Sequence, residues 1–257
     1  MFERELRRAA ELLSQSDYAV ALTGAGVSTP SGIPDFRSPD SGLWNHVDPF
    51  RVASLAAFRR DPKAFYDWLR PLAGLVRDAQ PNPAHLALAR LEALGVVKAV
   101  ITQNIDRLHH KAGSVAVHEV HGNLSQATCL CCYAEYAVAP YLDGFIHNGD
   151  IPHCPTCGCA LKPNVILFGE QLPANVYTAA HQAARRCDAM LVAGSSLEVE
   201  PVGGLPRLAA LHQARLIVVN YQRTHVDHLA EVVIHDDVAA VLPRIVDVLD
   251  EIRQGTR

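Results

Sequence analysis

The chain has 257 residues, of which 49% are hydrophobic and 19% are charged. This composition is that of a globular protein and excludes a disordered, collagenous or coiled-coil chain. Twenty-three Lys and Arg residues against 27 Asp and Glu residues give a net charge of -4, and no stretch concentrates the basic residues. We therefore expect no direct nucleic-acid binding. The length allows one large α/β domain, or one domain that carries an insertion.

The N-terminal segment predicts an amphipathic helix, because Leu6, Ala9, Ala10 and Leu13 share one helical face. It lacks the uninterrupted apolar core of a signal peptide. No other run approaches the roughly 18 apolar residues that are needed to span a bilayer. We therefore expect a cytoplasmic protein that does not associate with membranes.

Short buried strands alternate with helical segments along most of the chain. The expected strands are 18–23, 96–101, 188–192, 215–219 and 232–234, and the expected helices are 84–94, 174–186, 202–212 and 238–253. Asn82 and Pro83 supply an N-cap and a first-turn proline for the first of these helices, and Gly95 ends it. This alternation predicts an α/β fold with helices on both faces of a parallel sheet and ligands at the carboxyl ends of its strands.

Two stretches interrupt the alternation. Residues 34–75 contain a proline-punctuated loop and then a helix near 62–75, and residues 125–163 contain most of the cysteines but little apolar periodicity. We interpret both stretches as insertions that form a smaller module. The main domain would then consist of residues 1–33, 76–124 and 164–257.

The first predicted strand runs directly into a loop that contains Gly24 and Gly26, at which the backbone could approach a phosphate without obstruction by a Cβ atom. This placement fits a dinucleotide-binding loop. The third glycine of the usual fingerprint is missing, since Gly32 lies too far along the chain. By itself the pattern fits an ordinary strand-to-helix turn equally well.

Six of the seven cysteines gather in two clusters. Two C-x2-C pairs, 21 residues apart, account for four of them: Cys129, Cys132, Cys154 and Cys157. Two such pairs present four thiolates tetrahedrally to zinc and leave no open position for water, so we expect one structural zinc ion and not a disulfide framework. Cys131 and Cys159 lie beside the pairs, and either could replace a ligand. Cys187 is expected to be a buried core thiol.

Polar side chains follow the second predicted strand, where a parallel sheet places its ligands. Asn104 and Asp106 could each hydrogen-bond a ribose or an amide, although Asp106 could instead cap a short helix. His121 precedes a Gly-Asn turn at the junction with the cysteine cluster, and its imidazole suits general-base work near neutrality. Because the chain has 13 histidines, an ordinary surface or core role stays open for His121. For His109 and His110 we expect such an ordinary role.

Eight motifs in one order resemble the sirtuin (Sir2) family of NAD-dependent protein deacylases, of the bacterial or archaeal type. Besides the paired C-x2-C cysteines, the motifs are GAGVSTPSGIPDFR, SGLW, TQNIDRLHHKAG, VHGN, LKPNVILFGE, GSSLEVEP and VVNYQRT. The resemblance implies a Rossmann-like domain with a smaller module, in which a zinc ribbon joins a helical insertion. It also implies that NAD, which is consumed as co-substrate, meets an acyl-lysine peptide in the cleft between them.

The resemblance also implies roles for individual residues. His121 would be the general base on the ribose hydroxyls, and Asn104 and Asp106 would hold the nicotinamide ribose and carboxamide. Contacts to NAD would come from Gly24, Ala25, Gly26, Ser28, Asp35, Phe36, Arg37, Gln103, Asn104, Ile105, Asp106, Gly194, Ser195, Ser196, Asn220 and Val238. The substrate peptide would pair as an added strand with the segment that contains Val165, Phe168, Gly169 and Glu170.

The choice of acyl group depends on a departure from one family pattern. Sirtuins that prefer succinyl-lysine or malonyl-lysine carry a Tyr-x-x-Arg pair after the Gly-Leu-Trp segment, and its Arg meets the acyl carboxylate. Here Leu69 stands three residues after Tyr66, and Arg70 follows at the fourth. We therefore expect an apolar acyl tunnel and acetylated protein lysines as substrates, with Tyr66 and Arg70 as a helix-surface pair.

Other functions remain open at this point. The chain could act on longer or acidic acyl-lysines, or as a mono-ADP-ribosyltransferase or NAD hydrolase, since activation of the same ribose carbon serves any nucleophile. A non-enzymatic NAD-sensing module would not need the set of Asn104, Asp106 and His121. Hydride transfer is disfavoured, because the motifs resemble a family that cleaves the glycosidic bond of NAD.

Overall fold

A six-stranded parallel sheet forms the larger part of the computed structural model, which describes residues 2–35, 42 and 47–255. The strands are β1 (Ala19–Thr23), β2 (Val97–Thr102), β3 (Val117–Glu119), β7 (Ala189–Ala193), β8 (Arg215–Val219) and β9 (Val232–Ile234). β1 and β7 are buried along their whole length, as expected of central strands that helices cover on both faces. The predicted parallel sheet is therefore confirmed, and β3 is a strand that the sequence pattern did not reveal.

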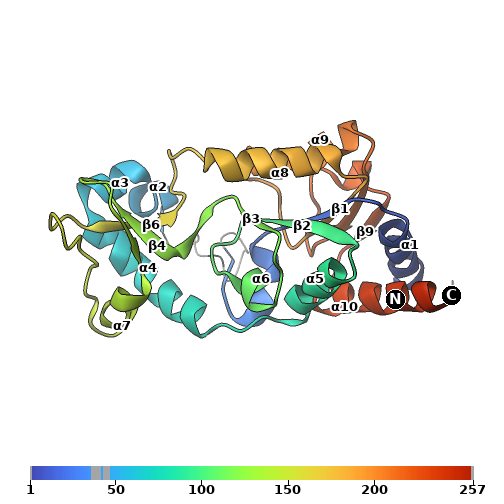
Figure 1. Cartoon of the computed structure of the whole chain (residues 1–257), viewed down its shortest axis with the longest axis horizontal. Coiled ribbons are helices and arrows are strands. Elements are labelled where there is room, and N and C mark those ends of the chain that lie inside the picture. The colour runs from blue at the N-terminus through green and yellow to red at the C-terminus, as the bar shows by residue number, and fades with distance from the viewer. Residues whose placement is uncertain (1, 36–41, 43–46, 256–257) are drawn as a thin grey trace.

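Helices pack on both faces of this sheet (Figure 1). One face is covered by α1 (Glu3–Ser14), α5 (Pro83–Ala93) and α10 (Val238–Gly255), which share a core cluster with the sheet. The other face is covered by α8 (Ala174–Arg186) and by α9 (Leu205–Leu211), which a 3-10 turn at Val202–Gly204 precedes. The Asn82 side chain caps α5 by accepting a hydrogen bond from the Ala84 N–H, as the Asn-Pro sequence predicts.

The strand order indicates where along the sheet a ligand would bind. It runs β3-β2-β1-β7-β8-β9, so the chain builds outward from β1 in one direction and from β7 in the other. The connection after β1 therefore leads to β2 on one side of the sheet, and the connection after β7 leads to β8 on the other side. In an open α/β sheet this reversal point is where a crevice for a ligand forms.

A smaller module lies at one end of the molecule, on the left in Figure 1. Its helices are α2 (Pro49–Val52), α3 (Leu55–Arg60), α4 (Pro62–Asp78) and α7 (Ala139–Asn148). Its antiparallel sheet has the order β5-β4-β6, with β4 (Gly122–Cys129), β5 (Glu135–Ala137) and β6 (Leu161–Val165). β4 begins before residue 125 and β6 ends after residue 163, so both strands run across the boundaries expected from the sequence. The short helix α6 (Leu108–Lys111) follows β2.

Tyr66 and Arg70 tie the parts of the smaller module together, and the expectation of a helix-surface pair is wrong. Tyr66 is 2% exposed, and its hydroxyl donates to the Leu161 carbonyl at 2.5 Å. Burial raises the pKa of Tyr66, so the hydroxyl keeps its proton. Arg70 donates to the carbonyls of Ile146 at 2.9 Å and of His147 at 2.6 Å. The two side chains thereby fasten α4 to β6 and to the end of α7.

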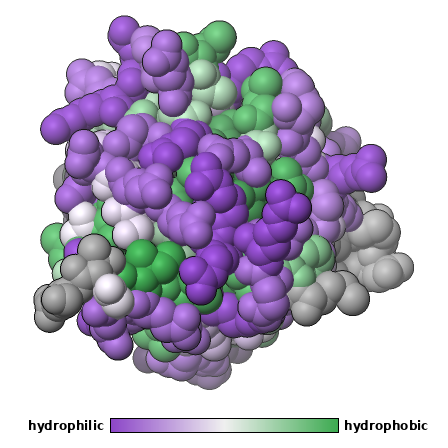
Figure 2. Space-filling model, turned by 90° about the vertical axis from the view of Figure 1, so that its right-hand side faces the viewer, coloured by the Kyte–Doolittle hydropathy of each residue, from purple (hydrophilic) through white to green (hydrophobic). Residues whose placement is uncertain are grey.

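Figure 2 shows the end of the molecule that lies away from the smaller module. Hydrophilic side chains cover most of this face, and apolar ones appear between them in separate small groups. Within residues 2–35, 42 and 47–255, no helix combines the length and the apolar character that crossing a bilayer requires. The broad apolar surfaces of the main domain thus lie inside, between the sheet and its helices.

Candidate active site

A cavity of about 1100 Å³ opens between the carboxyl edge of the parallel sheet and the smaller module. Its floor consists of the loops that follow four parallel strands: β1, β2, β7 and β8. The residues implied by the resemblance that line it are Gly24, Ala25, Gly26, Asp35, Gln103, Asn104, Ile105, His121, Val165, Phe168, Gly169, Glu170, Gly194, Ser195, Ser196 and Asn220. Segments that are far apart in the sequence therefore meet at the edge where a parallel sheet binds ligands.

Three of the implied residues that the structure describes are not among those that line the cavity. Ser28 and Asp106 lie behind it, with 2% and 6% of their surfaces exposed. Val238 begins α10 and packs in the core beside α1 and α5. Phe36 and Arg37 lie outside the described residues.

A buried polar network supports the floor of the cavity. The Ser28 hydroxyl donates to Asp106 Oδ2 at 2.6 Å, and Asp106 Oδ1 accepts from the Leu108 N–H at 2.8 Å. The N-cap of α6 is Arg107, so the alternative interpretation of Asp106 as the N-cap is wrong, although Asp106 does accept from the first N–H of that helix and also fixes Ser28. Ser28 Oγ in turn accepts from Asn104 Nδ2 at 3.0 Å. Asp106 therefore acts on the cavity through Ser28 and Asn104.

Asn104 presents one defined group to the cavity. Its Nδ2 donates to the Gly24 carbonyl at 2.9 Å as well as to Ser28 Oγ, so both amide hydrogens are used. The amide oxygen is then the group left for a ligand, and it can only accept a hydrogen bond. A ribose hydroxyl is a matching donor.

The glycines of the first loop are required for packing against a second loop. A Cβ atom on Gly24 would come within 2.8 Å of Ser195 Cβ, and one on Gly26 within 2.9 Å of Gly194 Cα. Gly194 itself has φ of +58°, and its Cβ would lie 2.4 Å from the Val27 nitrogen. The two loops are in direct contact, and the Gly26 N–H donates to the Gly194 carbonyl at 2.9 Å. Glycine is therefore needed at these three positions chiefly because any side chain would separate the loops.

His121 is held in one tautomer. Its Nδ1 lies 3.1 Å from the Gln103 carbonyl oxygen, which can only accept, so the proton is on Nδ1 and Nε2 carries the free lone pair. Burial lowers the pKa of His121 below its usual value, although the hydrogen bond to Gln103 opposes this shift. The ring is therefore neutral at physiological pH. A neutral imidazole with an unprotonated Nε2 at a cavity wall is equipped to take up a proton.

Gln103 also connects the loop after β2 to the loop after β7. Its Nε2 donates to Ser195 Oγ at 2.8 Å, and that oxygen also accepts from the Leu197 N–H at 3.2 Å. The same residue thus orients His121 through its carbonyl and the second loop through its side chain. The strands that carry these loops, β2 and β7, both pair with β1.

The segment after β6 is fixed by its own hydrogen bonds. Phe168 bridges to Ser54: its N–H donates to the Ala53 carbonyl at 2.9 Å and its carbonyl accepts from the Leu55 N–H at 3.0 Å. The Glu170 carboxylate accepts from the Leu167 N–H at 2.8 Å and pairs with Lys162 at 2.9 Å. Glu170 thus shapes the segment through its side chain.

The smaller module contributes an apolar wall to the cavity. This wall combines side chains of α4 with others from the end of β6 and from the loops after β2 and β6: Phe65, Trp68, Leu69, Leu72, Ile105, Val165, Leu167 and Phe168. The resemblance named Ile105, Val165 and Phe168, but the sequence indicated only an apolar tunnel for the residues of α4, because their helical spacing is equally typical of a core-facing helix. None of the lining residues in the described part of the chain is Lys or Arg, whereas Asp35, Glu170, Glu198 and Glu200 are acidic.

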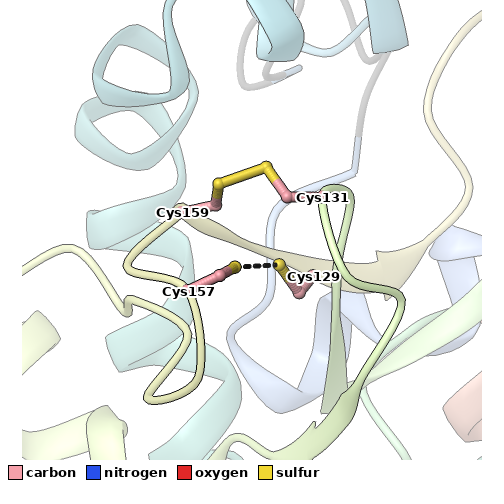
Figure 3. A group of neighbouring side chains, drawn as sticks. All are labelled: Cys129, Cys131, Cys157 and Cys159. Carbon is pink, nitrogen blue, oxygen red and sulfur yellow. Dashed lines mark hydrogen bonds between the residues drawn. A yellow bond between two sulfur atoms is a disulfide. The ribbon is translucent and has the colours of Figure 1, made fainter.

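The clustered cysteines lie at the far side of the smaller module. Each C-x2-C pair lies on a tight turn, and the ligand sulfurs of Cys129, Cys132, Cys154 and Cys157 are all within 4.8 Å of one another. Four thiols at such separations fit a tetrahedral zinc ion, which would be structural. Cys131 and Cys159 form a disulfide beside this set (Figure 3), so the expectation that the cluster contains no disulfide is wrong for these two. Cys187 is buried at 2% exposure, as predicted.

Comparison with known proteins decides the family, because residues 24–201 match the sequence profile described as the Sir2 family. The chain belongs to the Sir2 family. It is 45% identical to NAD-dependent protein deacylase 2 of Archaeoglobus fulgidus, over 98% of this chain and 98% of that protein.

Two solved Sir2 structures share the fold. One was determined with a deacetylated p53 peptide and 3'-O-acetyl ADP ribose; it has a TM-score of 0.89 and 37% identity over 94% of this chain and 97% of the other. The second is Sir2Af2 bound to a myristoylated histone peptide, with a TM-score of 0.84 and 40% identity over 98% of this chain and 99% of the other.

This Sir2 protein also buries two histidines behind the floor of its cavity, and the sequence did not single out their roles. His109 Nε2 lies 2.9 Å from Thr23 Oγ1, at the end of β1, and the rings of His85 and His109 are 4.9 Å apart in an edge-on contact. Burial lowers the pKa of His85 to about 4 and that of His109 to about 3. Both rings are therefore neutral parts of the core, as the alternative interpretation of His109 anticipated.

Proposed function

We propose that this Sir2 protein is an NAD-dependent protein lysine deacetylase, which transfers the acetyl group of acetyl-lysine to ADP-ribose and releases nicotinamide. The observation that carries the proposal is the neutral His121, with its free Nε2 on the wall of a cavity that joins a dinucleotide loop to an apolar pocket. The deacylase from Archaeoglobus fulgidus supports the proposal by its name and its identity over nearly the whole chain.

The donors and acceptors on the cavity floor suit NAD. The turn Gly24–Gly26 offers a backbone approach for the diphosphate, and the Asn104 amide oxygen offers an acceptor for a ribose hydroxyl. Asn220 closes the floor at the end of β8, where the adenosine half would lie. When bound, NAD supplies a ribose carbon that becomes electrophilic as nicotinamide leaves.

The residues of the chain then have separate tasks. Asn104 holds the ribose, and Asp106 and Ser28 hold Asn104 through the buried network. His121 Nε2 accepts a proton from a ribose hydroxyl, while the Gln103 carbonyl stabilises the ring that becomes positively charged.

We infer the acyl preference from the apolar wall. Phe65, Leu69 and Leu72 can surround a methyl group or a longer hydrocarbon chain, and the described lining offers no cationic partner for a succinyl carboxylate. Acetyl-lysine is therefore the proposed substrate, and a longer uncharged acyl chain is the second candidate, favoured by the structure of Sir2Af2 with a myristoylated peptide.

We propose further that the main domain of residues 1–33, 76–124 and 164–257 binds NAD, and that the substrate peptide lies along the segment after β6. The segment's fixed shape, set by the Phe168 bridge and the Glu170 carboxylate, supports this placement. One zinc ion would hold the two cysteine turns together. Acetylated protein lysines would be the macromolecular partners.

One assay tests the proposal against its alternatives. The protein is incubated with NAD and, in turn, an acetyl-, succinyl- or myristoyl-lysine peptide, and all products are identified by mass spectrometry. We expect O-acetyl-ADP-ribose, nicotinamide and free lysine peptide in equal amounts. Free ADP-ribose without acyl transfer would indicate an NAD hydrolase, and ADP-ribose attached to protein would indicate a transferase. Either result, with the peptide left acylated, would refute deacetylation.

A further inference from the structure

The six clustered cysteines form two overlapping sets of four, and the proposed zinc site uses only one of them. The first set is Cys129, Cys132, Cys154 and Cys157, and the second set is Cys129, Cys131, Cys157 and Cys159. In each set all four sulfur atoms lie within 4.8 Å of one another. The two sets share Cys129 and Cys157. The cluster therefore has the connectivity of two tetrahedra with one common edge.

Backbone hydrogen bonds hold the two turns in this arrangement. On the first turn, the Tyr133 N–H donates to the Cys129 carbonyl at 2.9 Å; on the second, the Cys154 N–H donates to the Cys159 carbonyl at 2.8 Å. Figure 3 shows Cys129 and Cys131 on one turn facing Cys157 and Cys159 on the other. The second set is thus built by the same turns that build the first.

The sulfur separations suit thiolate coordination at the first site and along the shared edge. Zinc-sulfur bonds of about 2.3 Å place the corners of a tetrahedral site about 3.8 Å apart. The sulfurs of Cys129 and Cys157, which form the shared edge, are 3.4 Å apart, and those of Cys132 and Cys154 are 3.5 Å apart. Small shifts of side chains bring the first set to the spacing that a metal requires, and the second set can reach it once the Cys131–Cys159 bond has been opened. The shared edge is already short enough for two bridging thiolates.

The charge of the cluster also permits a second ion. One divalent ion with four thiolates carries a net charge of -2, and two divalent ions with six thiolates carry the same net charge. One ion with six thiolates would carry -4, which like-charge repulsion disfavours. When all six cysteines are reduced, a second ion therefore stabilises the cluster electrostatically.

We propose that the reduced cysteine cluster binds two zinc ions, which Cys129 and Cys157 bridge. Cys132 and Cys154 complete the first site, and Cys131 and Cys159 complete the second. The proposal rests on the structural zinc site proposed above and extends it.

The Cys131–Cys159 disulfide removes two ligands of the second site, so the oxidised cluster holds one ion. A phosphine reductant opens this disulfide: the phosphine takes an oxygen from water and becomes its oxide, and two protein thiols form. Each of these thiols releases its proton when the second ion binds. Cys131 is exposed, so a reductant can reach it.

Metal counting tests the proposal directly. The wild-type protein, with or without phosphine treatment, is equilibrated with zinc chloride and freed of loose metal by gel filtration, and zinc per chain is measured by elemental analysis. We expect one ion before reduction and two after it. The matched control is the Cys131→Ser/Cys159→Ser double variant, which keeps the first set intact and should hold one ion under both conditions.

A second measurement locates the second ion. The reduced, zinc-loaded protein is alkylated with iodoacetamide, and peptide mass mapping shows which cysteines are protected. Protection of Cys131 and Cys159, lost when only one equivalent of zinc is supplied, supports the second site. One ion in both the reduced wild type and the double variant would overturn it while leaving the first site standing. No ion in any sample would refute both sites, and two ions in the double variant would place the second ion elsewhere.

Discussion

Replacement of His121 by alanine is the sharpest test of the proposed mechanism. Only Nε2 of this ring can accept a proton, because Nδ1 donates to the Gln103 carbonyl, and alanine offers no substitute for it. Loss of a general base lowers the rate by roughly two to four orders of magnitude, which corresponds to about 3 to 5 kcal/mol of transition-state stabilisation. His121 acts after nicotinamide has departed, so the variant should retain acyl-dependent nicotinamide exchange.

The assay compares deacetylation with exchange of labelled nicotinamide into NAD, after NAD binding and thermal unfolding have shown that the variant is folded. The matched control is His118→Ala. His118 lies on β3, three residues before His121, is half-buried and does not line the cavity. Its replacement should leave deacetylation near the wild-type rate. Wild-type deacetylation by folded His121→Ala, or an equal loss in His118→Ala, would refute the assignment of the base.

Further predictions concern pH, the zinc site and the acyl group. In the unfolded chain His85 and His109 become protonated below pH 6.5. In the folded chain their pKa values are lowered to about 4 for His85 and about 3 for His109, so both rings stay neutral until the pH reaches those values. At pH 5 the two together should lower the free energy of unfolding by about 4 kcal/mol, and a denaturant titration of wild type against His85→Gln checks this; equal pH dependence would contradict it. Activity should fall in acid with an apparent pKa below 6.5, since burial lowers the pKa of His121; a limb at higher pH in kcat/KM would exclude it as the base. Cys154→Ser should lose zinc and lower both Tm and activity, and intact stability without zinc would disprove a structural ion. Leu69→Arg should raise the ratio of kcat/KM for succinyl peptide to kcat/KM for acetyl peptide at least tenfold. An unchanged ratio would show that the apolar wall of the cavity does not determine the acyl preference.

The main domain could be predicted from the sequence because its strands are continuous apolar runs between capped helices. The strands β8 and β9 were expected at the residues where they occur, and both are rich in β-branched side chains that favour buried strands. The strand β3 escaped prediction. It has three residues, and all of them are only partly buried at the edge of the sheet, so no apolar run marks it.

Contacts between distant segments could not be predicted. Gly24 and Gly26 suggested a phosphate loop, but their closest contacts are with Gly194 and Ser195, and no local pattern reports such a contact. The Cys131–Cys159 disulfide likewise depends on how two turns face each other across the module. The spacing of the C-x2-C pairs defines four ligands within two turns. Cys131 lies between two of these ligands and Cys159 lies after the last one, so only the tertiary fold determines that they pair with each other.

The polar residues of the cavity floor act as one unit, and this explains why single residues of the motifs were ambiguous. Asp106 is both a partner of the first turn of α6 and the acceptor that orients Ser28, and Ser28 orients Asn104. Asn104 also binds the Gly24 carbonyl, so the loops after β1 and β2 move together. Asp106 precedes the N-cap of α6, which is Arg107, yet it joins the start of that helix to the floor of the cavity. Its orientation is set because each of its carboxylate oxygens accepts a hydrogen bond, one from the Ser28 hydroxyl and one from the Leu108 N–H.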